Sequence, residues 1–99
     1  SDVPKADVVI TNPTHIACAI QYDPKTMAAP KLVAKGASVI AEKIKEIARA
    51  NGVPVLENKP LARTIYKTLK IGQGIPRELF TAVAQVLSYV YKLKRKATF

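Results

Sequence analysis

Short apolar runs alternate with longer amphipathic segments along the whole chain. The short runs are rich in β-branched and small apolar residues, and they predict strands at residues 7–11, 16–22, 31–35 and 53–57. In the other segments apolar residues recur every three or four positions, which predicts helices at residues 37–50, 59–70 and 76–94. This alternation indicates an α/β domain with a mixed central sheet of about four strands flanked by helices. The 99 residues are enough for one such domain and leave no room for a second core.

Individual residues predict where the helices begin and which face they bury. Gly36 is expected to open the first helix, and the apolar positions that start at Ile40 are expected to face the core. Asn58 is expected to cap the second helix, with Pro60 in its first turn. The last helix is apolar nearly all round, so it either lies between layers or is offered to a partner.

Charge and composition limit the possible partners and cofactors. Sixteen Lys and Arg residues against seven Asp and Glu give a formal net charge of +9. Such a surface favours nucleic acid, acidic protein surfaces or anionic lipid headgroups. Cys18 is the only cysteine and His15 the only histidine, which excludes an internal disulfide and argues against a zinc centre. We expect no metal and no cofactor.

Hydrolytic and nucleotide-binding motifs are absent from the sequence. No serine lies in a G-x-S-x-G elbow, and neither glycine-rich phosphate-binding motif occurs. Cys18 falls in the middle of a predicted buried strand, where a cysteine is far more often a small core residue than a nucleophile. The sequence therefore predicts no conventional turnover enzyme.

The connection between the first two predicted strands is Asn12-Pro13-Thr14-His15. A short connection of this kind predicts an antiparallel hairpin. Asparagine at the first position and proline at the second suit a type I turn, and Thr14 at the third argues against type II, which needs a positive φ there. We therefore expect a type I turn with the Asn12–Pro13 bond at its tip.

The Asn12–Pro13 bond has an unusual chemical option. Proline has no N–H, so the ordinary ageing route of asparagine, attack by the following backbone nitrogen, is closed. The remaining route is attack by the Asn12 side-chain nitrogen on the Asn12 carbonyl carbon, which would expel Pro13 as a new amino terminus. His15 is a candidate for shuttling protons. Most Asn-Pro turns are inert, so the spacing alone leaves both readings open.

Several blocks of the sequence, in order and at close spacing, resemble one known family. They are residues 7–15, 29–36, 53–58, 60–63 with Tyr66, 71–76 and 82–87. The first contains the Asn-Pro-Thr-His motif that gives this family its cleavage site. The whole chain resembles the cytoplasmic C-terminal domain of the FlhB/YscU family, which includes EscU and SpaS and acts in type III secretion. Residues 22–23, 71–73 and 89–94 resemble the flagellar FlhB branch more than the needle branch.

The resemblance implies a role in protein export. Members of this family have an upstream membrane part and a linker, which places residues 1–99 at the cytoplasmic face of the bacterial inner membrane. It implies a single self-cleavage between Asn12 and Pro13, with Thr14 and His15 completing the motif, rather than repeated turnover. The N-terminal piece is expected to stay associated, and the cut is expected to switch the export gate from early to late substrates.

The sequence offers two candidate partner-binding surfaces. The resemblance implies an apolar surface for export substrates, at Ala29, Pro30, Ala84 and Leu87. The charge pattern of the second predicted helix gives a basic stripe for acidic chaperones, other export-gate proteins or lipid headgroups, formed by Arg63, Lys67 and Lys70. The alternatives are that the apolar positions belong to the core and that the stripe is a solvated face.

A small basic α/β RNA-binding module is the competing interpretation. Its size, its charge and a strand followed by a proline-initiated helix are all compatible with this sequence. However, only six aromatic residues occur, most of them at positions that a core would use. No stacking platform for bases is apparent, so we do not expect a nucleic-acid partner.

Overall fold

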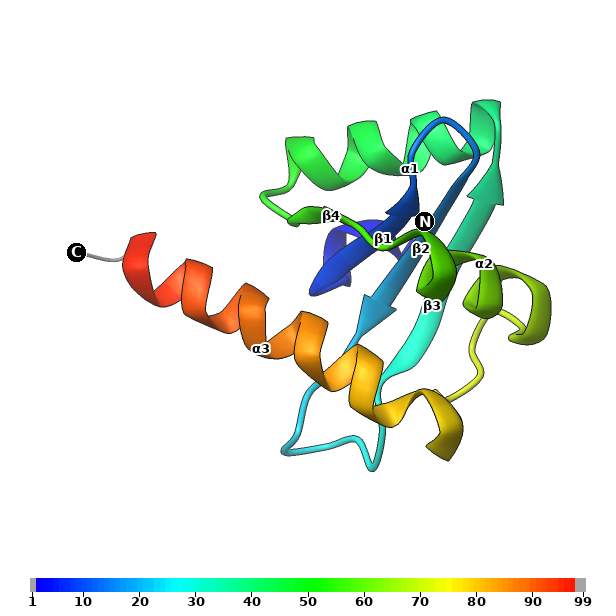
Figure 1. The fold of residues 1–99 in the computed structure, drawn as a ribbon. Helices are drawn as coiled ribbons and strands as arrows, with labels where there is room; N and C mark the ends of the chain where they lie inside the picture. Colours follow the sequence, from blue (N-terminus) through cyan, green and yellow to red (C-terminus); the bar gives the residue numbers. More distant parts are fainter. Residues whose placement is uncertain (1, 98–99) are drawn as a thin grey trace.

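A four-stranded mixed sheet lies at the centre of the protein, with helices on both of its faces (Figure 1). The computed structural model describes residues 2–97, and the side chains of residues 2–95. The strands, in the spatial order β3-β2-β1-β4, are β1 (Val8–Asn12), β2 (Ile16–Gln21), β3 (Lys31–Ala37) and β4 (Val55–Glu57). Strand β1 is antiparallel to β2 and parallel to β4, and β2 is antiparallel to β3. The predicted mixed α/β sheet and its first hairpin are confirmed.

The helices divide the interior into two cores. Helix α1 (Val39–Ala50) and the short 3-10 helix η1 (Val3–Lys5) cover one face of the sheet. Helix α2 (Lys59–Thr68) and helix α3 (Phe80–Ala97), which follows the 3-10 turn η2 (Arg77–Leu79), cover the other face. The predicted last helix is therefore a 3-10 turn that leads into a longer α-helix.

Strand β1 is an interior strand and contributes to both cores. Val8 and Ile10 pack toward α2 and α3, whereas Val9 packs toward α1, as the alternation of side chains along a strand requires. All three side chains are fully buried. Burial of a valine or isoleucine contributes about 1.5–3 kcal/mol, so this strand is held firmly from both sides.

The beginning of the first helix differs from the prediction. Gly36 lies inside β3, paired with Ala17, and α1 begins only at Val39. The reason is nonlocal, because pairing with β2 extends β3 by two residues beyond its predicted end. Ile40 is 60% exposed and lies over Gly36, where a Cβ atom would collide with the Ile40 side chain. The buried face of α1 is instead formed mainly by its other apolar residues, Ala41, Ile44 and Ala48.

Both ends of helix α2 are capped by side chains. The Asn58 carboxamide oxygen accepts a hydrogen bond from the Leu61 N–H at 3.2 Å, which confirms the predicted N-cap. At the other end the Lys35 Nζ donates to the carbonyl oxygens of Tyr66, at 2.9 Å, and Leu69, at 2.7 Å. The same ammonium lies 5.1 Å from the centre of the Tyr66 ring. A lysine from β3 thus neutralises the negative end of a helix that follows it by more than twenty residues.

Replacing Lys35 by methionine removes this cap while keeping most of the apolar stem. We expect the free energy of unfolding to fall by about 1–2 kcal/mol, because two charge-assisted hydrogen bonds to carbonyl groups are lost. Urea denaturation followed by circular dichroism measures the change. Lys67→Met, at an exposed position on the same helix, is the matched control and should change the stability by less than about 0.5 kcal/mol. Equal effects of the two substitutions would contradict the capping role.

Candidate functional site

Residues 12–15 form a tight turn between β1 and β2. The His15 N–H donates to the Asn12 carbonyl oxygen at 3.0 Å, and Thr14 has a φ of 72°. Proline at the second position with a positive φ at the third is the arrangement of a type II turn, so the expected type I turn is wrong. Thr14 adopts a left-handed conformation that costs a residue with a Cβ atom roughly 1 kcal/mol or more.

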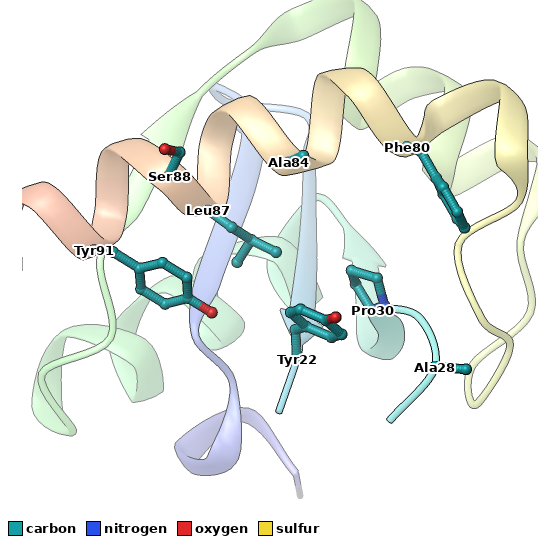
Figure 2. Close-up of a pocket in the computed structure, with 8 residues that line it drawn as sticks. All are labelled: Tyr22, Ala28, Pro30, Phe80, Ala84, Leu87, Ser88 and Tyr91. Carbon is teal, nitrogen blue, oxygen red and sulfur yellow. The ribbon is translucent and has the colours of Figure 1, made fainter. Parts of the chain in front are cut away.

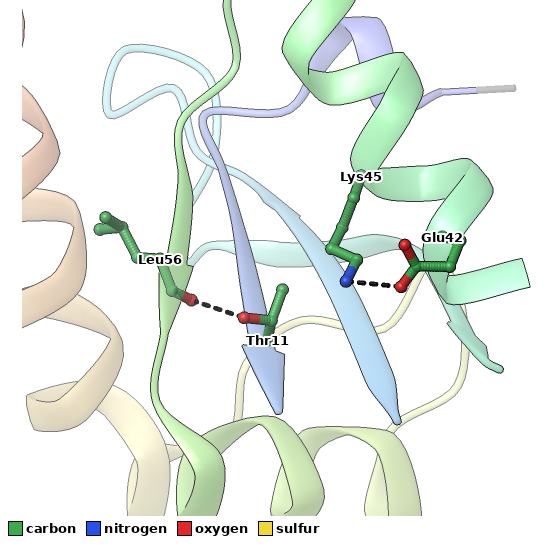
Figure 3. A network of polar contacts seen from close by, with 4 residues as sticks. All are labelled: Thr11, Glu42, Lys45 and Leu56. Atoms are coloured by element: carbon green, nitrogen blue, oxygen red, sulfur yellow. Dashed lines mark hydrogen bonds and ion pairs between the residues drawn. The ribbon is translucent and has the colours of Figure 1, made fainter. Parts of the chain in front are cut away.

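The strands on both sides of the turn are held by contacts with other elements. On the β1 side, the Thr11 carbonyl oxygen accepts from the Asn58 N–H at 2.9 Å, and the Thr11 hydroxyl donates to the Leu56 carbonyl oxygen at 3.4 Å (Figure 3). On the β2 side, the His15 carbonyl oxygen accepts from the Ser38 N–H at 3.0 Å. These fixed ends explain why Thr14 accepts an unfavourable φ, because the strands determine the path that the connection must take.

An ion pair stands on the α1 side of this region. The Lys45 ammonium contacts the Glu42 carboxylate at 2.6 Å, and only 12% of the Lys45 side chain is exposed (Figure 3). The pair is local to α1, three residues apart, and no hydrogen bond links it to Thr11 within residues 2–97. It therefore takes no part in the hydrogen bonds that hold the turn.

The Asn12 carbonyl group is the part of the turn that is already polarised by a hydrogen bond. Its oxygen already accepts the His15 backbone N–H, a donor that would stabilise negative charge developing on that oxygen. Asn12 and Pro13 are half-buried, whereas Thr14 and His15 are exposed. The His15 side chain is therefore in reach of water, and the Asn12–Pro13 bond joins two half-buried residues.

Cys18 offers no alternative chemistry. It is fully buried, and its Sγ lies 3.6 Å from the Ala62 carbonyl oxygen, to which the thiol donates. Burial raises the pKa of the Cys18 thiol to about 12, although the positive charge of Lys35 acts in the opposite direction. The thiol is protonated at neutral pH, and the prediction that Cys18 is a core residue is confirmed.

A second candidate site is an apolar pocket of about 340 Å³ between α3 and the end of β2 (Figure 2). Its lining residues are Tyr22, Ala28, Pro30, Phe80, Ala84, Leu87, Ser88 and Tyr91. The structure thus brings together three of the four apolar positions expected from the sequence. Ala29 does not line the pocket, and its neighbour Ala28 takes that place. Leu87 is only 4% exposed and also belongs to the core, whereas Ala84 is open to solvent.

The sequence interpretation missed the aromatic residues of this pocket. Phe80, Ala84, Leu87 and Tyr91 follow one another on α3 at spacings of four, three and four residues, which puts them on a single helix face. Phe80 is 44% exposed and Tyr91 39%, unusually high for large residues on an apolar face. This spacing is the signal by which the sequence could have identified the pocket residues of α3. Tyr22, in contrast, reaches the pocket only because β2 ends beneath α3.

The basic stripe lies on the exposed side of α2. Arg63 and Lys67, one helical turn apart, flank a shallow groove with Pro60 and Thr64. Lys70 is exposed but lies beyond the last residue of α2, so it continues the stripe without belonging to the helix. All three basic side chains are exposed to solvent.

The described part of the chain offers neither a metal site nor a helical membrane span. Within residues 2–97, no three His, Cys, Asp or Glu side chains are grouped closely enough to hold a metal ion. No helix in the same part of the chain combines the length and the apolar character needed to cross a bilayer.

Comparison with known proteins gives consistent relatives. The chain is 56% identical over 95 residues to the flagellar biosynthetic protein FlhB of Escherichia coli, and 52% identical over 95 residues to FlhB of Bacillus subtilis. Each alignment covers 96% of this chain but only 25% and 26% of the relative. The chain therefore spans about a quarter of the length of the curated relatives that it matches.

Solved structures share the fold. The cytoplasmic domain of FlhB from Shewanella putrefaciens superposes with a TM-score of 0.93 at 48% identity, covering 98% of this chain and 74% of that one. A variant of the EscU C-terminal domain superposes with a TM-score of 0.86 at 32% identity, covering 90% and 95%. The higher identity to FlhB than to EscU agrees with the predicted flagellar branch. The sequence model of the FlhB HrpN YscU SpaS family matches residues 1–90, and this chain belongs to that family.

Proposed function

We propose that this chain is the cytoplasmic domain of a flagellar protein-export component that cuts itself once, between Asn12 and Pro13. The observation that carries the proposal is the turn itself, in which a strained residue follows an Asn-Pro bond whose carbonyl already accepts a hydrogen bond. Family membership and the match to an FlhB cytoplasmic domain support it. In the full-length protein, a membrane part would hold this domain at the cytoplasmic face of the inner membrane.

The proposed reaction needs no cofactor and no external reactant. The Asn12 side-chain nitrogen attacks the Asn12 carbonyl carbon, and a new C–N bond closes a succinimide ring. The bond from that carbon to the Pro13 nitrogen breaks. One proton leaves the side-chain amide and one reaches the Pro13 nitrogen, carried by water or by the exposed His15 ring. The His15 N–H stabilises the charge on the carbonyl oxygen in the tetrahedral intermediate.

The structure supports the expectation that the two pieces remain together. Residues 8–12 pair with five residues of β2 and residues 9–11 with three of β4. Val3, upstream of the strand, is buried against α1 as well. A cut after Asn12 removes none of these contacts, so only the loop gains freedom. We propose that this local change alters which substrates the export gate accepts, from early ones to late ones.

Two surfaces of the domain serve its partners in this proposal. The apolar pocket at Pro30, Ala84 and Leu87 binds a segment of an export substrate, because it is concave, apolar and open to solvent. The stripe of Arg63, Lys67 and Lys70 faces acidic surfaces of neighbouring export-gate proteins or chaperones. Nothing in the structure or among the relatives supports the alternative of an RNA-binding module.

Cleavage is tested by mass spectrometry of the purified domain. Under denaturing conditions we expect fragments of residues 1–12 and 13–99, the second with an amino-terminal proline. Under native conditions we expect the summed mass of one complex, because β1 stays in the sheet. Asn12→Ala should give a single intact chain, since the attacking amide is missing, with an unchanged circular dichroism spectrum. Wild-type protein that stays uncut during long storage at neutral pH would contradict the proposal.

Replacing Thr14 tests the contribution of backbone strain. Glycine adopts a positive φ without penalty, so Thr14→Gly should cleave about fivefold more slowly than Thr14→Ala, as expected for loss of about 1 kcal/mol of strain. Thr14→Ala is the matched control because it removes the hydroxyl group but keeps the strained Cβ. Gel electrophoresis of protein refolded from denaturant gives both rates. Equal rates for the two variants would show that strain plays no part.

A charge placed in the apolar pocket tests the docking surface. Ala84→Glu should lower export of rod and hook proteins by about tenfold in cells that depend on the variant, because an apolar ligand would have to desolvate the carboxylate. Gln85→Glu puts the same charge at the next exposed position of α3, outside this pocket, and should leave export unchanged. Immunoblots of secreted protein give the readout. A similar loss with both variants would argue against docking at this pocket.

A further inference from the structure

The apolar pocket has an acidic end, formed by two carboxylates that lie outside its lining. Asp7 and Asp23 both adjoin Tyr22, a lining residue: the Asp7 carboxylate accepts from the Tyr22 N–H at 2.7 Å, and Asp23 follows Tyr22 directly. The Asp23 carboxylate accepts from the Lys25 N–H at 2.9 Å, which fixes its position in the loop after β2. Neither carboxylate forms an ion pair within residues 2–97.

The two carboxylates act on the pocket from the side of Tyr91. Burial raises the pKa of the Tyr91 phenol above its ordinary value, and electrostatic interactions with Asp7, Tyr22 and Asp23 raise it further. Figure 2 shows the Tyr91 ring at one end of the pocket, Phe80 at the other, and the Tyr22 ring between them, beside Pro30. The pocket is therefore asymmetric, because both carboxylates act on its Tyr91 end.

From this asymmetry we infer that the pocket selects a segment in which an apolar side chain adjoins a lysine or arginine. The apolar side chain packs against Leu87, Ala84 and Pro30, and the cation lies toward the Tyr91 end, where Asp7 and Asp23 attract it. This inference rests on the docking function proposed above and specifies the chemistry of its ligand.

This local preference is opposite to the preference of the molecule as a whole. The chain carries a net charge of +9, so its overall field attracts acidic partners and repels basic ones. Two carboxylates without an ion-pair partner, beside an apolar cavity, reverse that preference over a short distance, within about 8 Å at physiological salt. An apolar ligand with an acidic neighbour would lose affinity there, so the pocket discriminates by repulsion as well as by attraction.

The two carboxylates of the acidic end come from opposite sides of the proposed cut. Asp7 belongs to the segment before Asn12, whereas Asp23, Tyr22 and Tyr91 belong to the part after it. The pocket keeps its full charge only while the N-terminal segment remains in the sheet, held partly by the bond from Tyr22 to Asp7.

Synthetic peptides test the inference directly. The probes are three ten-residue peptides that share one leucine and differ at the neighbouring position, which is lysine, glutamine or glutamate. Titration of the isotope-labelled domain, followed by NMR, gives the affinities and shows whether Ala84 and Leu87 respond. We expect the lysine peptide to bind about fivefold more tightly than the glutamine peptide, and the glutamate peptide more weakly than both, as measured for exposed to half-buried charge pairs.

Substitutions assign the preference to the two carboxylates. Asp7→Asn with Asp23→Asn keeps an oxygen acceptor for each backbone N–H and should abolish the lysine preference, leaving the glutamine peptide unaffected. Glu46→Gln with Glu57→Gln removes the same charge at exposed positions outside the pocket and should preserve the preference. The single variants give the share of Asp7, which lies before the proposed cut.

The possible results separate the two proposals. Binding of the glutamine peptide that Ala84→Glu abolishes, without any gain from lysine, would overturn the charge preference and leave the docking function standing. An equal loss for all three peptides in the Asp7→Asn, Asp23→Asn variant would do the same, because it would indicate a structural effect. No binding of any peptide to the wild-type domain would overturn the docking function and this inference together.

Discussion

The position of β1 inside the sheet is the constraint on which both candidate sites depend. This strand is paired on both edges and buried on both faces, so its last residues cannot move independently of β2 and β4. Asn12 is the final residue of the strand, and the carbonyl beside Pro13 inherits that rigidity. A reaction in which a poor nucleophile must meet a neighbouring carbonyl gains most from such positioning, because orientation replaces random collision. The sheet therefore holds the reacting groups of the turn in position, as an active site holds a bound substrate.

The same strand connects the turn with the pocket. One end of it holds Thr11, whose carbonyl is bonded to Asn58 at the start of α2. Just before the other end lies Asp7, whose carboxylate is bonded to the backbone of Tyr22 at the edge of the pocket. A change in how firmly the N-terminal segment is held would alter both the acidic end of the pocket and the support of the turn. The two sites are thus linked by one element rather than by proximity.

The sequence predicted the elements of this fold better than their junctions. Periodicity and β-branched runs placed the four strands and the helices within a few residues, because these signals are local. The errors fall where distant contacts decide: Gly36 stays in β3 because β2 pairs with it, and Thr14 takes a positive φ because Asn58 and Ser38 hold both sides of the turn. Residues of the pocket on α3 were accessible through their helical spacing. Tyr22 was not, because no sequence pattern tells which helix crosses the end of a strand.

The proposed cut leaves the fold intact, which limits how a partner could detect it. The buried side chains of β1 and its pairing with two neighbours would be unchanged, so no partner could recognise the cut from the shape of the sheet. What would change is the surface formed by Pro13, Thr14 and His15, whose covalent link to β1 is the bond between Asn12 and Pro13. Release of the strain at Thr14 would also disfavour the reverse change, because the freed residues would have to adopt the unfavourable left-handed conformation again. A partner that distinguishes the two states must therefore contact this hairpin tip, or a surface to which the released residues move.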